Sequence, residues 1–236
     1  MRVQWPLCRI ECPHDRLGRA AEAAFPDSSR VKGLIRHPRV RAMLDAPALF
    51  MAFRYPLVGS QRRTRELIHA HLDAKAGERV LDICCGIGEF AGEVSSEYLG
   101  IDLNPRFIEA AARRWAAAAR KSFRVMDALR MDLPDRHFDR TMWINGLHHF
   151  SDEDAVRLLR EIGRVTRTRV LIIDADGTPR GLVRRALLAA DRGDWMRTPE
   201  AQRQLIGSIL PIREVVTYRV GFYAEVLYDC GVTPSS

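Results

Sequence analysis

Short apolar runs that end at glycine or at an acid recur along the middle of the chain, with helical patterns between them. Val80–Cys84 is one such run and Tyr98–Asp102 is a second. Each is short and bounded by turn residues, so each is predicted as a buried strand. Between them we expect a tight turn at Gly86 and Gly88, and a helix that starts within Gly88–Val94. This order is typical of the nucleotide-binding half of a doubly wound α/β fold.

The remaining patterns continue the alternation of strands and helices. Further strands are predicted at Ser122–Met126, Phe138–Ile144 and Val170–Asp174, and helices at Gln61–Ala74, Phe107–Arg120 and Glu153–Arg164. Strands that alternate with helices favour a mainly parallel sheet. The end of the chain differs, with helices expected at Gly181–Ala190 and Pro199–Ile209, then strands at Arg213–Val220 and Phe222–Tyr228. We expect these last two strands to form an antiparallel hairpin.

Polar residues and prolines mark where three of the helices begin. Asn104-Pro105 precedes one helix and Thr198-Pro199 precedes another, and proline suits the first helical turn. Ser151 stands before a third helix, where its hydroxyl can cap the exposed backbone N–H groups.

Length and composition indicate one α/β domain with an appendage. The 236 residues are 47% hydrophobic and 28% charged, which is ordinary for a globular protein and enough for one sizeable core. We predict an N-terminal tail and helical cap over 1–60 and a core domain over 61–236. The net charge of +7 favours anionic partners, although solvated basic helix faces account for it more simply.

Cysteine usage and hydropathy exclude several classes of protein. The five cysteines are odd in number and scattered, so no disulfide framework is expected. Cys8, Cys12 and His14 lack an evident fourth ligand, so no metal site is expected. Neither a membrane span nor a signal peptide is predicted, because long apolar runs are missing and charges occur throughout Met1–Ala20. A cytoplasmic protein is therefore expected.

The residue types around the first turn indicate a nucleotide-like ligand. Gly86 and Gly88 let the backbone approach a ligand where a Cβ would collide. Asp102 can accept hydrogen bonds from ribose hydroxyls. Gly86–Ala91 satisfies the dinucleotide pattern G-x-G-x-x-A, but Asp82 would put a carboxylate where a dinucleotide brings its phosphates. A ligand that carries an ammonium group suits this acid better.

The string D-I-C-C-G-I-G, which begins at Asp82, resembles motif I of class I S-adenosylmethionine-dependent methyltransferases, usually written D-x-G-x-G-x-G. The resemblance implies a Rossmann-like, doubly wound, seven-stranded and mainly parallel sheet, with a C-terminal antiparallel hairpin and an N-terminal helical cap. It implies S-adenosyl-L-methionine as cofactor, with Asp82 near its amino acid end and Asp102 on its ribose. The cofactor-binding residues expected are Asp82, Cys84, Gly86, Gly88, Asp102, Leu103, Asp127, Ala128 and Asn145. Cys84 departs from the motif, which has glycine there.

Acids recur at or just after four predicted strand ends: Asp82, Asp102, Asp127 and Asp174. Ligands of open α/β sheets bind at the carboxyl ends of strands, although any of these acids could instead cap a helix. By the resemblance, Asp127 would accept from the adenine amine, and the backbone amide of Ala128 would meet a ring nitrogen.

Asn145 and His148 are the catalytic candidates, because by the resemblance the stretch after the fourth strand passes beside the methyl sulfonium. Asn145 would orient cofactor or substrate, and His148 would act as a general base with a pKa near neutrality. The alternative is that His148 and His149 pack and hydrogen-bond the start of the next helix. Further along, Arg192 and Arg197 could bind a carboxylate or phosphate, unless their segment only starts a helix.

We therefore predict methyl transfer, by direct displacement, to a small-molecule acceptor of natural-product type. An aromatic-rich set near residue 50 either caps the pocket or covers a sheet edge. The predicted protein is a monomer or homodimer with neither a nucleic-acid nor a membrane partner. Two alternatives stay open: an intramolecular cyclisation of S-adenosylmethionine that releases methylthioadenosine, and a nucleic-acid-directed methyltransferase or binder. A cofactor-binding regulator is also open, and Asp82 disfavours an oxidoreductase.

Overall fold

The computed structural model describes residues 61–178, 188 and 193–232. The predicted N-terminal tail and cap at 1–60, with its cysteines and aromatic set, lies outside the described residues. The same holds for most of the helix expected over 181–190 and for Arg192.

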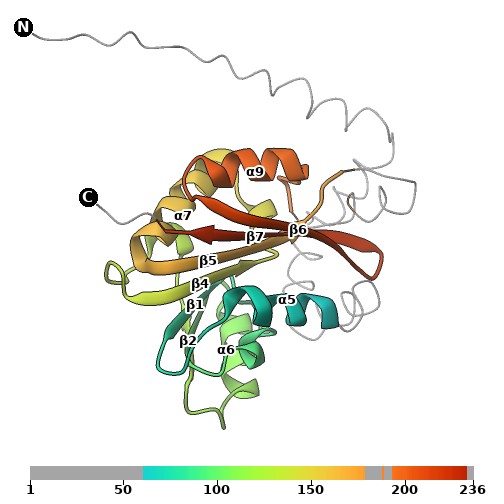
Figure 1. Cartoon of the computed structure of the whole chain (residues 1–236). Coiled ribbons are helices and arrows are strands. Elements are labelled where there is room, and N and C mark those ends of the chain that lie inside the picture. Colours follow the sequence, from blue (N-terminus) through green and yellow to red (C-terminus); the bar gives the residue numbers. More distant parts are fainter. Residues whose placement is uncertain (1–60, 179–187, 189–192, 233–236) are drawn as a thin grey trace, which may run out of the picture.

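Seven strands form one sheet in the order β3-β2-β1-β4-β5-β7-β6 (Figure 1). The first five strands are parallel to one another, and β7 runs antiparallel to both of its neighbours. This confirms the expected mainly parallel sheet with a C-terminal antiparallel hairpin. The strands are β1 (Arg79–Ile83), β2 (Glu97–Asp102), β3 (Lys121–Val125), β4 (Phe138–Ile144), β5 (Thr166–Ala175), β6 (Ile212–Val220) and β7 (Tyr223–Gly231).

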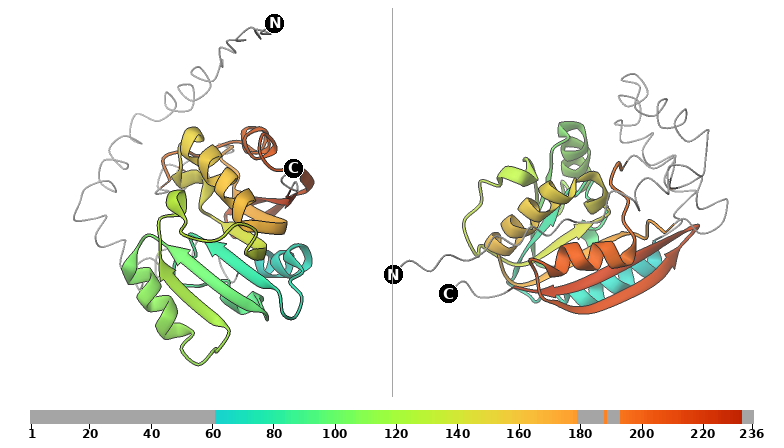
Figure 2. Two further views of the ribbon diagram at one scale, coloured as in Figure 1. Left: turned by 90° about the vertical axis from the view of Figure 1, so that its left-hand side faces the viewer. Right: turned by 90° about the horizontal axis from the view of Figure 1, so that it is seen from above.

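Helices cover both faces of the sheet (Figures 1 and 2). Side chains alternate across each strand, so β1 sends Leu81 and Ile83 into a core with α7 and α9, and Val80 into a second core with α5. The sheet therefore separates two apolar layers. The helices are α5 (Arg62–Leu72), α6 (Pro105–Arg114), α7 (Asp152–Val165) and α9 (Pro199–Gly207). None of the helices in the described part of the chain is long and apolar enough to cross a membrane.

The predicted helix caps are confirmed. The side chain of Asn104 accepts from the backbone N–H of Arg106 at 3.0 Å, at the start of α6. Ser151 caps α7 at 3.1 Å, and Thr198 caps α9 at 3.3 Å with Pro199 in its first turn. Each cap satisfies a backbone donor that the helix itself leaves without a partner.

Two predicted helices differ from the structure. The helix expected within Gly88–Val94 is only a 3-10 turn, Ala91–Glu93, because the glycine turn uses most of the short connection between β1 and β2. The helix predicted over Phe107–Arg120 ends at Arg114. The next residue, Trp115, turns its indole N–H to the carbonyl oxygen of Gly88 at 2.9 Å, a contact that sequence periodicity does not reveal.

Candidate functional site

The turn after β1 holds three backbone positions in the left-handed region. Cys84, Gly86 and Gly88 have φ angles of 56°, 55° and 66°. At Gly88 an added Cβ would lie 2.8 Å from a ring carbon of Phe123, so glycine is required for space as well as conformation. At Gly86 the same atom would meet no described atom within 4 Å, so the backbone is uncovered there. The left-handed conformation costs Cys84 about 1–2 kcal/mol.

Asp102 ties this turn to the end of β2. One carboxylate oxygen accepts the backbone N–H of Gly86 at 2.9 Å, and the other accepts that of Asn104 at 2.8 Å. The N–H of Cys85 adds a bond to the carbonyl oxygen of Ile101 at 3.0 Å. These bonds fix a half-buried carboxylate beside the backbone of Gly86.

Asp82 is buried rather than open at the end of its strand. Only 2% of the residue is exposed, and the hydroxyl of Tyr98 donates to its carboxylate at 2.6 Å. Burial raises the pKa of Asp82 to about 7; the Tyr98 hydrogen bond lowers it and the charge of Asp102 adds a smaller rise. Asp82 and Tyr98 lie on the same face of the sheet, so this hydrogen bond joins β1 to β2.

Three further cofactor candidates follow β2 and β3. Leu103 is 69% exposed, which leaves an apolar surface next to Asp102. Asp127 is exposed, and one of its oxygens caps the 3-10 helix Ala128–Arg130 by accepting from Leu129 at 2.9 Å. Asp127 therefore performs the capping role that the sequence left open for it, and Ala128 is buried beneath that turn.

Asn145 belongs to a buried polar network. Its backbone is left-handed, with a φ of 53°, and its amide donates to Glu225 on β7 at 3.4 Å. The hydroxyls of Tyr218 and Thr64 donate to the other oxygen of Glu225 at 2.7 and 3.2 Å. Burial first, and then the Glu225 charge, raise the pKa of Tyr218 well above its usual range. Sequence reasoning missed Glu225, whose only signal is that it is one of two acids in a mostly apolar strand.

His148 forms a buried pair with Asp174. Its Nδ1 lies 2.5 Å from Oδ1 of Asp174, and the two residues are 7% and 0% exposed. Oδ1 of Asp174 also accepts the N–H of Ala175 at 2.9 Å, while Oδ2 is buried and has no hydrogen-bond partner among the described residues. The carbonyl oxygen of His148 accepts the N–H of Trp195 at 3.0 Å. His148 is therefore held from both sides, by β5 and by the segment that leads into α9.

Arg197 binds a carboxylate of its own chain. Its guanidinium lies 2.6 Å from Asp152 and donates to the carbonyl oxygens of Leu147, Phe150 and Trp195. With 8% of the residue exposed and these bonds made, Arg197 braces the loop after β4. This arrangement disagrees with the suggestion that it binds an external carboxylate or phosphate.

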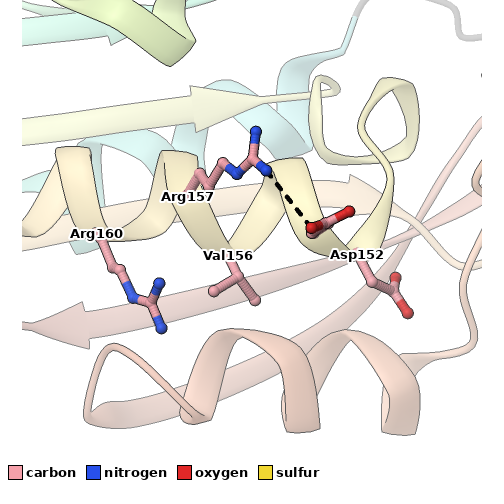
Figure 3. Close-up of a pocket in the computed structure, with 5 residues that line it drawn as sticks. Asp152, Val156, Arg157 and Arg160 are labelled. Carbon is pink, nitrogen blue, oxygen red and sulfur yellow. Dashed lines mark hydrogen bonds and ion pairs between the residues drawn. The ribbon is translucent and has the colours of Figure 1, made fainter.

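Two surface hollows among the described residues lie outside the candidate site, although Asp152, the partner of Arg197, lines the first of them. One, of about 520 Å³, follows the outer face of α7, where Arg157 donates to Glu153 at 3.4 Å (Figure 3). The other, of about 440 Å³, is lined by residues that begin β1 to β4, at the opposite edge of the sheet. Neither hollow includes a residue of the candidate site.

The predicted site residues nevertheless converge. Cys84, Gly86 and Gly88 follow β1, Asp102 and Leu103 end β2, Asp127 and Ala128 follow β3, and Asn145 and His148 follow β4. These four strands are neighbours in the parallel part of the sheet, so their carboxyl ends form one continuous edge. This edge is the candidate functional site.

Known proteins share both the sequence pattern and the fold. Residues 80–169 match a family model described as a methyltransferase domain. The methyltransferase GfsG of Streptomyces halstedii is 32% identical over 133 residues, which are 53% of this chain and 47% of that protein. The demethylmenaquinone methyltransferase of Thermobifida fusca is 31% identical over 160 residues, or 62% and 65% of the two chains. The chain thus spans about half the length of the first curated relatives it matches.

Solved structures show the same fold at low sequence identity. Magnesium protoporphyrin IX methyltransferase from Synechocystis PCC 6803, with bound SAH, has a TM-score of 0.63 at 16% identity and covers 82% of this chain and 98% of its own. The [4+2]-cyclase SpnF has a TM-score of 0.61 at 18% identity and covers 73% and 81%. The methyltransferase-domain match, the relatives and this fold together support a class I S-adenosylmethionine-dependent methyltransferase.

Proposed function

We propose that the protein transfers a methyl group from S-adenosylmethionine to a small-molecule acceptor by direct displacement. The observation that carries the proposal is the bond between Asp102 and Gly86, which fixes an acid beside an uncovered glycine backbone at the carboxyl edge. The relatives named above, and the 27-O-demethylrifamycin SV methyltransferase of Amycolatopsis mediterranei, support a small natural-product-type acceptor.

The residues at this edge fit the cofactor. The uncovered backbone at Gly86 leaves room for close approach, Asp102 is positioned for ribose hydroxyls, and the exposed side chain of Leu103 offers an apolar contact for adenine. Asp127 and Ala128 lie at the next strand end, where the adenine edge would reach. When bound, S-adenosylmethionine supplies a methyl group that its sulfonium already activates.

The protein therefore has to align the acceptor and exclude water more than it has to activate the methyl group. Where the acceptor is a hydroxyl, we propose that His148 takes its proton. The carboxylate of Asp174 accepts from Nδ1–H of His148, which leaves the basic lone pair on Nε2. Asn145, held by Glu225, would orient the cofactor or acceptor at the same strand end.

Two exposed aromatic side chains, one next to a backbone bond with His148 and one in the β6–β7 turn, favour an apolar acceptor. Trp195, which bonds to the His148 backbone, is 48% exposed, and Phe222 in the β6–β7 turn at this edge is 64% exposed. As part of the same proposal, the protein acts in the cytoplasm, in small-molecule biosynthesis, as a monomer or homodimer without a nucleic-acid partner. Gel filtration tests the oligomeric state. Salt-dependent retention on immobilised nucleic acid tests whether a nucleic-acid partner is missing.

Thermal unfolding with S-adenosylmethionine, S-adenosylhomocysteine and NAD in parallel tests the cofactor. A ligand at a hundred times its dissociation constant stabilises by about 2.7 kcal/mol, which is a shift of about 5–10 °C for a chain of this size. We expect shifts with the two adenosyl sulfur compounds and none with NAD. A shift with NAD alone would sink the proposal.

Cys84, in place of the motif's glycine, puts a side chain at the cofactor turn and motivates one alternative. This is an intramolecular cyclisation of S-adenosylmethionine that releases methylthioadenosine. Mass spectrometry of the spent cofactor, after incubation with candidate acceptors, separates the two reactions. Methyl transfer leaves S-adenosylhomocysteine and an acceptor heavier by one methylene, whereas cyclisation leaves methylthioadenosine and an unchanged acceptor.

A further inference from the structure

Three side chains with metal-binding groups meet where α5 packs against the sheet at the β6–β7 hairpin. His71 lies in the last turn of α5, which packs against β5 and β6 (Figure 1). Glu214 lies near the start of β6 and Asp229 near the end of β7. Asp229 pairs with Leu171 in the middle of β5, so these two positions lie in the antiparallel part of the sheet, outside the four strand ends of the candidate site.

The two carboxylates face each other across the hairpin. The register of β6 and β7 pairs Glu214 directly with Asp229, beside an irregularity at the start of β6. Like charges directly opposite one another destabilise an antiparallel pair. A cation held between the two would remove this repulsion, and His71 completes the group from the adjoining helix.

The spacing fits a shared ion better than direct hydrogen bonds. Nδ1 of His71 lies 3.6 Å from the nearer oxygen of Glu214 and 3.7 Å from that of Asp229. All three atoms lie within 4.8 Å of one another. N–H···O hydrogen bonds extend only to about 3.2 Å. Ligands about 2.0–2.2 Å from a tetrahedral Zn²⁺ are about 3.3–3.6 Å apart, close to the observed separations.

Burial and net charge also favour a bound cation. Asp229 is 6% exposed; its Oδ2 is the oxygen that faces His71, while its buried Oδ1 accepts no hydrogen bond from the described residues. Nε of Arg169 lies 3.5 Å from that oxygen, and the same guanidinium donates to the backbone oxygen of His71 at 2.7 Å. Two carboxylates and one guanidinium leave a net charge of −1, which a divalent cation reverses. The Glu214 side chain is 57% exposed, so the group opens to solvent on one side.

We propose that His71, Glu214 and Asp229 bind Zn²⁺, with water in the fourth position. An imidazole with two carboxylates suits Zn²⁺, whereas Mg²⁺ and Ca²⁺ prefer oxygen ligands throughout. The three ligands lie on α5, β6 and β7, outside the four strand ends that carry the candidate site, and the role proposed for the metal is structural. It joins the end of α5 to the β6–β7 hairpin, which is distant in sequence, and the proposal does not depend on the proposed function.

Zinc binding to the full-length protein, stripped with a chelator and titrated against a chromophoric competitor, tests the site. The variants are His71→Gln and Glu214→Gln, with His69→Gln as matched control. His69 lies on the same helix, is 61% exposed and pairs with Glu93 outside the group. We expect wild type and His69→Gln to bind one equivalent of Zn²⁺ more than the other two variants, since cysteines and other histidines contribute equally to all four proteins.

Thermal unfolding in Zn²⁺ and in Mg²⁺ gives an independent readout. At a hundred times the dissociation constant, Zn²⁺ should raise the Tm of wild type and His69→Gln by about 5–10 °C, and that of His71→Gln and Glu214→Gln by much less. Mg²⁺ should shift none of them comparably. The same zinc stoichiometry and the same Tm shift in all four proteins would overturn the proposal, even with every variant folded.

Discussion

The two glycines of the turn after β1 offer a matched test of the site geometry. Gly86→Ala and Gly88→Ala put the same methyl group on left-handed backbones, with φ of 55° and 66°. That conformation costs an L-residue about 1–2 kcal/mol, and the smaller entropy of the unfolded alanine chain offsets about 0.4–1 kcal/mol. We therefore expect Gly86→Ala to lower the free energy of unfolding by about 1 kcal/mol.

Gly88→Ala carries an additional steric cost. The new Cβ would lie 2.8 Å from Phe123 and 3.1 Å from the indole nitrogen of Trp115, which bonds to the Gly88 carbonyl. Overpacking of this kind costs about 1–3 kcal/mol, so the total is about 2–4 kcal/mol. Both contacts are with side chains of the protein itself, Phe123 on β3 and Trp115 just after α6, and involve no ligand.

Thermal unfolding followed by circular dichroism measures both variants without cofactor. For a chain of this size 1 kcal/mol shifts Tm by about 2–4 °C, so Gly86→Ala should lose about 2–4 °C and Gly88→Ala about 4–16 °C. Gly86→Ala should nevertheless lose affinity for S-adenosylmethionine in calorimetric titration, because its Cβ occupies the uncovered side of the turn. A Tm loss in Gly86→Ala equal to or larger than that in Gly88→Ala would refute the reasoning.

Three further expectations concern single side chains. Asp82 has a pKa of about 7 in the folded protein, above the ordinary value of about 3.9. Between these two pKa values the native state binds more protons at this carboxyl than the unfolded state does. The carboxyl therefore destabilises the fold increasingly as the pH rises from about 4 to about 7. The Tm gain of Asp82→Asn over wild type should therefore be larger at pH 8 than at pH 5, and a constant difference would contradict the shifted pKa. Asp102→Ala should weaken S-adenosylmethionine binding by about 100-fold, since two hydrogen bonds to a charged group contribute about 1.5 kcal/mol each. His148→Ala should weaken S-adenosylmethionine binding far less. Equal losses of affinity in the two variants, measured by calorimetric titration, would mean that the ribose site is misplaced. Arg197→Lys should lower Tm by several degrees, because lysine cannot make all the bonds by which the guanidinium holds Asp152 and three carbonyl oxygens; an unchanged Tm would argue against its bracing role.

Local features of the sequence predicted much of the fold and the location of the site. The strand Phe138–Ile144 has the predicted bounds, and the caps at Asn104, Ser151 and Thr198 are where the residue types placed them. These features depend on contacts within a few residues along the chain. The shared edge of the candidate site follows from them too, since parallel strands end on the same side of a sheet.

Features that depend on residues far apart in the sequence could not be predicted from these local patterns. The helix over Phe107–Arg120 was predicted too long, because its end is set by an indole that reaches the turn after β1. Arg197 satisfies its guanidinium with a loop about fifty residues earlier in the chain, so the anion-binding suggestion could not be tested from its neighbours alone. Asp82 was expected at an open strand end because sequence spacing does not show which side chain covers it.

The sequence by itself determined the alternation of strands and helices, the left-handed turn that requires glycine, and the acids at the strand ends, because periodicity, backbone sterics and capping act locally. The tertiary structure decided which of those polar groups are paired and buried. Glu225 meets Asn145, Asp174 meets His148, and Asp229 faces Glu214 beside His71. The physical reason is that burial and ionic pairing depend on which segments the sheet brings side by side, and segments far apart in the chain supply most of these partners.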